Sequence, residues 1–158
     1  MGDSAGDGRN ETEKERLDRN LNELLGELRV ALPGVQVLFA FLLAVPFNQG
    51  FAKATSFQKD VYLVTLLLTA GATALLIAPS AYHRIQFRQD DKKHIVFVSN
   101  RFAIVGFGVL AAAMTSAVLL VTDYIYGGST SVIATVGVGV ALYGLWYGAP
   151  LTRRVRER

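Results

Sequence analysis

The sequence contains no cysteine, which excludes disulfide bonds, thiol nucleophiles and thiolate metal sites. Charged residues are also scarce, at 18% of 158 residues, whereas an average soluble domain has about 25%. Residues 1–29 contain no apolar run of the kind that a cleavable signal peptide needs, so we expect no such peptide. These absences argue against both a secreted disulfide scaffold and an ordinary soluble domain.

Recognisable catalytic and metal-binding patterns are missing as well. His83 and His94, the two histidines, are eleven residues apart, which is about 16 Å along a continuous helix and too far to share a metal ion. Ser80 lies near His83 and precedes Asp90 and Asp91, but no nucleophile-elbow pattern surrounds it. No glycine-rich loop precedes a Lys-Ser or Lys-Thr pair. We therefore expect no catalytic residue, no cofactor, no metal ligand and no enzymatic activity.

Hydrophobic residues, by contrast, make up 51% of the chain and gather in four long runs. Each run approaches the roughly 20 apolar residues that a helix needs to cross a bilayer. The predicted spans are residues 30–47, 61–79, 102–122 and 132–149. The predicted fold class is an all-α membrane protein, a bundle of four transmembrane helices preceded by an N-terminal amphipathic helix.

The segments outside the spans are polar. Residues 1–10 are rich in Gly, Asp and Ser and are expected to form a flexible tail. Residues 11–29 carry leucines at steps of three and four, which predicts an amphipathic cytoplasmic helix. That helix could lie on the membrane surface or pack against the protein's own cytoplasmic face, and Pro33 could bend its junction with the first span. Residues 151–158 form a basic tail.

The basic residues predict the orientation. Fourteen of the sixteen lie in the N-terminal segment, in the central connection around residues 80–101 and in the C-terminal tail. Since cytoplasmic segments hold the excess of Lys and Arg, we predict four spans with both termini in the cytoplasm. Basic residues that flank membrane spans suit anionic lipid headgroups better than nucleic acid, so the expected partners include the lipid bilayer and exclude nucleic acid.

A polar cluster is predicted at the cytoplasmic ends of the first two spans. Its members are Glu27, Arg29, Gln36, His83, Arg84 and Arg88. We expect Glu27 to pair with Arg84 or Arg88, because a carboxylate this close to the bilayer needs a charge partner. The alternative is that each arginine only anchors its helix end by reaching the headgroups.

Two stripes of small or hydroxylated residues run along the predicted spans. Gly137, Ala141, Gly144 and Gly148 share one face of the fourth span, a spacing that favours close helix packing within the subunit or between subunits. We expect a homo-oligomer on this basis. Thr65, Thr69 and Thr73 form a second stripe, whose hydroxyls could bond to their own helix's carbonyls or line a pathway.

Two segments resemble those of a known family. The stretches 27–47, ELRVALPGVQVLFAFLLAVPF, and 78–88, APSAYHRIQFR, resemble signature segments of a small bacterial membrane protein family with four spans. That family is common in actinobacteria and catalogued as a domain of unknown function. The resemblance covers about residues 20–150 and implies four helices and a plasma-membrane location, but no activity. The motif positions it favours are Glu27, Arg29, Pro33, Gln36, Pro46, Pro79, His83, Arg84 and Arg88.

The sequence leaves two functional hypotheses. The first is a non-enzymatic structural, regulatory or accessory membrane component with a polar cluster at its cytoplasmic face. The alternative is an oligomeric ion channel or small-solute transporter, in which Thr65, Thr69 and Thr73 would line the pathway. No span carries a charge at mid-depth, a mark that ion pathways commonly leave, and the sequence identifies no transported ion or molecule.

Overall fold

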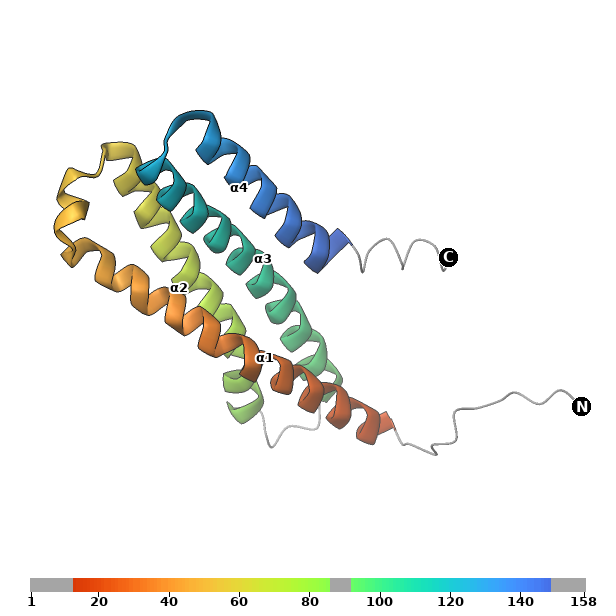
Figure 1. Ribbon diagram of the computed structural model, residues 1–158. Coiled ribbons are helices and arrows are strands. Elements are labelled where there is room, and N and C mark those ends of the chain that lie inside the picture. Colours follow the sequence, from red (N-terminus) through yellow and green to blue (C-terminus); the bar gives the residue numbers. More distant parts are fainter. Residues whose placement is uncertain (1–12, 86–91, 149–158) are drawn as a thin grey trace, which may run out of the picture.

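The computed structural model describes residues 13–85 and 92–148, so the predicted tails 1–10 and 151–158 lie outside the described residues. The described ranges are helical and contain no strand (Figure 1). The elements are α1 (Glu13–Ala44), the short 3-10 helices η1 (Val45–Phe47) and η2 (Gln49–Lys53), α2 (Ser56–Ile85), α3 (Lys92–Ile125), α4 (Gly128–Tyr143) and the π-helical turn η3 (Gly144–Gly148).

Four helical segments are long and apolar enough to cross a membrane, which confirms the predicted fold class. They cover Glu15–Phe47, Ser56–Tyr82, Lys93–Ile125 and Gly128–Gly148. The segments on α1 and α3 have 33 residues each, or about 50 Å of helix, whereas a bilayer's hydrocarbon core is about 30 Å thick. The helices therefore extend beyond the predicted spans, and the central connection shrinks to the few residues between α2 and α3.

The predicted amphipathic helix and the first span form one continuous helix, α1. Buried leucine and valine side chains recur on it at every seventh residue: Leu21, Leu28, Val35 and Leu42. A strict seven-residue repeat keeps one face of a helix against its neighbours, so the same face packs along the whole length of α1. Pro33 lies inside the helix on its exposed side. A proline there removes one backbone hydrogen bond, but the packing of the opposite face on both sides of it keeps the helix continuous.

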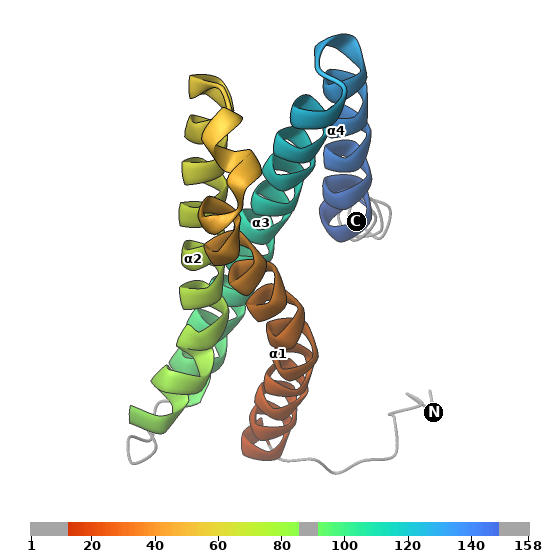
Figure 2. The same cartoon turned by 60° about the vertical axis from the view of Figure 1, so that its left-hand side comes forward.

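The antiparallel pair α2 and α3 forms the centre of the molecule, and α1 crosses it obliquely (Figure 2). Small residues line their contact: Ala72 of α2 and Ala113 of α3 are completely buried, and a Cβ added at Gly106 of α3 would meet Leu75 and Leu76 of α2. Such residues let membrane helices approach closely, which replaces the hydrophobic driving force that lipid does not supply. Leu28, Val35 and Leu76 complete the core.

The threonine stripe on α2 lies in this contact. The hydroxyls of Thr65, Thr69 and Thr73 each donate to the carbonyl four residues earlier, at 2.7–2.8 Å. Thr65 also shares a 2.7 Å hydrogen bond with Ser116 of α3. The interpretation that these hydroxyls bond to their own helix is therefore confirmed, and Thr65 and Thr69 have no exposed surface.

The fourth helix packs against α3 alone among the described helices, so the expected bundle is a three-helix core with α4 on its outside (Figure 2). Gly127 and Gly128 make the turn between α3 and α4, with positive φ angles that favour glycine. The Tyr143 hydroxyl donates to the Gly108 carbonyl at 3.0 Å, and the Tyr147 hydroxyl donates to that of Ile104 at 2.5 Å. Two tyrosines thus fasten the end of α4 to the backbone of α3.

Polar side chains tie the helices together at the end where α2 begins. Thr55 and Gln58 form a reciprocal cap: the Gln58 side chain accepts from the Thr55 N–H at 3.0 Å, and the Thr55 hydroxyl accepts from the Gln58 N–H at 3.2 Å. The Gln58 amide then donates to the Asp123 carboxylate on α3 at 3.0 Å. Nearby, the buried hydroxyl of Tyr62 donates to the Leu42 carbonyl of α1. This end therefore joins all three core helices.

Candidate functional site

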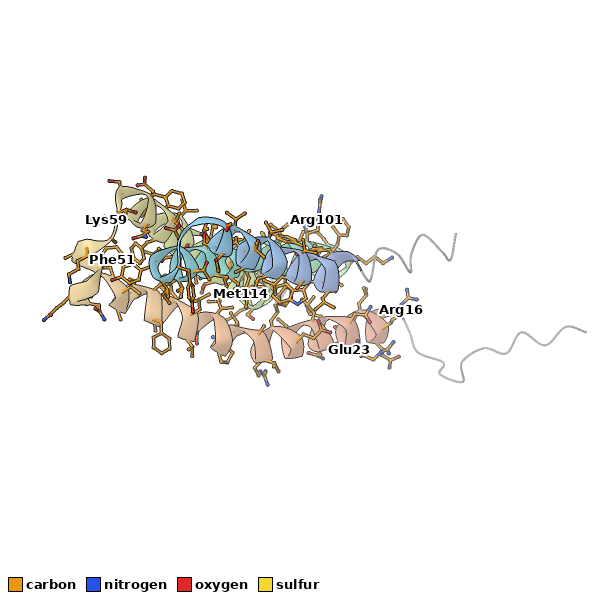
Figure 3. All side chains as sticks on the ribbon, turned by 45° about the horizontal axis from the view of Figure 1, so that its top comes forward. Arg16, Glu23, Phe51, Lys59, Arg101 and Met114 are labelled. Carbon is orange, nitrogen blue, oxygen red and sulfur yellow. The ribbon has the colours of Figure 1, made fainter. Side chains whose placement is uncertain are left out.

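The described charged residues gather toward the two ends of the long axis. Arg16, Glu23 and Arg101 lie toward one end, Lys59 lies at the other, and Met114 lies between them (Figure 3). On α3 no charged residue occurs between Arg101 and Asp123, a distance of about 33 Å of helix that matches the thickness of a bilayer. The first half of α1, the end of α2 and the start of α3 therefore project beyond the apolar slab on one side. We call this projection the charged end.

Of the predicted polar cluster, Glu27 and Arg84 lie at the charged end, whereas Arg29 and Gln36 follow on the second half of α1. Glu27, Arg29, Gln36 and Arg84 are all exposed. Within the part of the chain that the structure describes, Glu27 and Arg84 form no ion pair. Arg88 and the side chain of His83 lie outside the described residues, so a contact of Glu27 with either stays a prediction.

The apolar side of the amphipathic segment faces α3. Leu21 is 7% exposed and Leu28 is 1% exposed, so protein covers them. Leu17, Leu21 and Leu24 line one wall of a groove of about 410 Å³, and Val96 and Phe97 of α3 line the other. Of the two interpretations that the sequence left open, the structure therefore favours packing on the protein over lying on the membrane surface.

The remaining polar groups at this end contact aromatic rings. Tyr82 of α2 and His94 of α3 have ring centroids 6.4 Å apart, and the Arg101 guanidinium lies 5.5 Å from the Phe97 ring. Among residues 13–85 and 92–148, no three His, Cys, Asp or Glu side chains lie close enough together to hold a metal ion. The charged end therefore offers contacts of a binding surface, and its described side chains do not form a recognisable catalytic group.

The small-residue stripe of the fourth span faces away from α3. Gly137, Ala141 and Gly144 are exposed, and a methyl group added at Gly137 or Gly144 would meet no atom within 4 Å. The contact with α3 uses Gly139 instead, where an added Cβ would lie 3.4 Å from the Thr115 methyl group. The sequence left open whether this stripe packs within the subunit or between subunits. At Gly137 and Gly144 it makes no close contact with the described residues of the subunit.

The sequence did not lead us to predict the hydrogen bonds between helices at the other end of the molecule. Thr55 and Gln58 have the spacing of a capping box directly before an apolar run, so this pattern could have been found. The partner Asp123 lies 65 residues further along the chain, and nothing local indicates that contact. The tyrosine contacts of α4 were also missed, because both acceptors are backbone carbonyls of α3.

Residues 13–85 and 92–148 thus contain four helices long and apolar enough to cross a membrane. The family of unknown function DUF6328 matches residues 10–150. The chain belongs to this family. The family match agrees with the resemblance drawn from residues 20–150, and it assigns no activity. No curated protein and no solved structure matches the chain.

Proposed function

We propose that this DUF6328 member is a non-enzymatic, self-associating component of the bacterial plasma membrane, with a structural, regulatory or accessory role. The observation that supports the proposal is the uncovered stripe on α4. Gly137 and Gly144 leave the backbone of this helix accessible, and none of the described residues of the subunit lies within 4 Å of a Cβ added at either glycine. Stripes of small residues let two membrane helices approach closely, so a second copy of the chain is the partner that the stripe suits.

The interior of the core supports this role over that of a channel or transporter. Leu28, Val35 and Leu76 are buried where the three core helices meet, and these side chains offer an ion no ligand. The threonine hydroxyls that would line a pathway already donate to carbonyls of α2. A conducting pathway would need polar groups directed into an open space.

Substituting the stripe tests self-association. We expect Gly144→Leu and Gly137→Leu to reduce the oligomer to a smaller species in mild detergent, because a leucine side chain prevents the close approach of two helices. The melting temperature of the subunit should change by no more than a few degrees, because both sites are open in it. Light scattering with size-exclusion chromatography measures the mass.

Gly34→Leu is the matched control. Gly34 is an exposed glycine on α1 with nothing within 4 Å of an added Cβ, so this variant should keep the wild-type mass. A wild-type protein that is already monomeric would contradict the proposal, as would unchanged masses for both α4 variants. Ion flux through liposomes containing the wild-type oligomer would instead favour the channel.

We further propose that both termini and the charged end lie in the cytoplasm. Because the chain has no cysteine, single cysteines report position without background. We expect Ser129→Cys to react with a membrane-impermeant maleimide on intact cells, and Ser4→Cys and Gln89→Cys to react only after permeabilisation. The reverse pattern would show that the fourteen basic residues lie outside, against the charge rule.

A further inference from the structure

A cavity of about 400 Å³ lies at the opposite end from the charged end. It is lined by the last turn of α1, the η1–η2 segment, the start of α2 and the last turns of α3. Phe41, Val45 and Val121 line its apolar part, while Asn48, Gln58 and Tyr124 line its polar part. Its volume falls within the range of about 300–1,000 Å³ that is typical of small-molecule sites.

The cavity opens sideways, between α1 and α3, toward the surrounding bilayer. Three of its apolar lining residues are largely exposed: Phe41 at 70%, Val121 at 54% and Ile125 at 61%. Asp123 marks the boundary of the apolar slab on α3, and Val121 and Leu120 lie on the hydrocarbon side of it. On α1, Phe41 is three residues before the end of the helix at Ala44, or about 4.5 Å deeper along it. The cavity therefore runs from the headgroup level into the hydrocarbon.

The polar part of the cavity retains donors after its internal hydrogen bonds are made. The side-chain oxygen Oδ1 of Asn48 accepts from the Gly50 N–H at 2.9 Å, so the side-chain NH₂ group of Asn48 points away from Gly50. The Tyr124 hydroxyl donates to the Gly50 carbonyl at 3.3 Å. Lys53, which is exposed, directly precedes the lining residue Ala54. Asn48 and Lys53 stand at the two ends of the short helix η2, and an amide N–H and an ammonium group each suit a phosphate oxygen.

We propose that this cavity binds one acyl chain of a glycerophospholipid from the adjacent leaflet, with the lipid phosphate at Asn48 and Lys53. Along the membrane normal, the cavity changes from an apolar lining to a polar one, and a phospholipid changes in the same direction from acyl chain to charged headgroup. A second copy of this chain is the other possible occupant, and the experiments below distinguish it from a lipid. The proposal goes beyond the proposed function and does not depend on self-association.

Filling the cavity tests the proposal. Ala44 is exposed and lines the cavity, so Ala44→Phe should occupy it without disturbing the core. Ala40→Phe, one turn earlier on an exposed position of α1 outside the cavity lining, is the matched control. Delipidated protein titrated with dioleoylphosphatidylglycerol is measured by native mass spectrometry. We expect one tightly bound lipid per chain for wild type and Ala40→Phe, and at least tenfold weaker binding for Ala44→Phe.

The headgroup contact is tested separately. One lysine near an anionic lipid contributes about 1 kcal/mol, so Lys53→Gln should weaken binding about fivefold. Equal lipid binding by Ala44→Phe and Ala40→Phe would overturn the proposal, because the bound lipid would then be bulk annular lipid. A loss of oligomer mass in Ala44→Phe with unchanged lipid binding would overturn it in favour of a second copy. Failure of the α4 variants to change the mass leaves the lipid result unaffected, so the two proposals can fail independently.

Discussion

Gly106→Ala is expected to destabilise the protein by about 1–3 kcal/mol, the usual cost of overpacking a core. An added Cβ would lie 2.8 Å from Leu76 Cδ2, 3.0 Å from Leu76 Cγ and 3.2 Å from Leu75 Cβ. Leu76 has no exposed surface, so it has no free space to move into. The added methyl group must therefore push α2 and α3 apart. A lower melting temperature in detergent, followed by the loss of the monodisperse peak in size-exclusion chromatography, would show this.

Gly71→Ala is the matched control, because it makes the same chemical change in the facing helix. Its nearest neighbour would be a Val109 methyl group at 4.0 Å, an ordinary van der Waals contact. Alanine is also the better helix former by about 1 kcal/mol. This variant should therefore be as stable as wild type or more stable. Equal melting temperatures for the Gly71 and Gly106 variants would show that the α2–α3 contact has room for the added methyl group.

Gln58→Glu is expected to have the second large effect, a loss of about 2 kcal/mol or more at neutral pH. The amide of Gln58 donates to Asp123, and a hydrogen bond to a charged group contributes about 1.5–3 kcal/mol. The substitution keeps the oxygen that caps Thr55, but it brings two carboxylates together at a side chain that is only 8% exposed. Thermal unfolding of the variant and of wild type would measure the difference.

Restoring a donor on the other side should reverse the loss. Adding Asp123→Asn to Gln58→Glu exchanges the positions of amide and carboxylate. The hydrogen bond between α2 and α3 can then form again, with residue 123 as the donor and residue 58 as the acceptor. The double variant should recover most of the lost stability. Gln49→Glu, the same charge change at an exposed position of the same end, should have little effect. Additive losses in the double variant would contradict a direct contact between residues 58 and 123.

The existence of four helices could be predicted because crossing a bilayer demands long apolar runs, and those runs are visible in the sequence. The helix boundaries could not be predicted in this way. The requirement for apolar residues applies only inside the bilayer, whereas α1, α2 and α3 continue beyond it. Pro33 and Pro79 also suggested boundaries, yet each lies inside a helix. The repeat of Leu21, Leu28, Val35 and Leu42 already implied one continuous packed face.

The candidate sites were harder to predict, because they depend on which way each helix turns. Glu27 adjoins the most buried leucine of α1, but its own position on the helix faces away from the core. The stripe on α4 was recognised from its spacing, whereas its outward direction depends on Gly139 packing against Thr115. The contact between Gln58 and Asp123 joins residues far apart in sequence, which no local pattern specifies.

The dependence of α4 on a single neighbour has a consequence for how the chain is made. Every residue of the buried core cluster belongs to α1, α2 or α3, so that core is complete in sequence once residue 125 has left the ribosome. The last helix then adds to a finished surface and contributes nothing to its interior. Its attachment to α3, which includes the hydrogen bonds of the tyrosines at 143 and 147, can therefore form after that core.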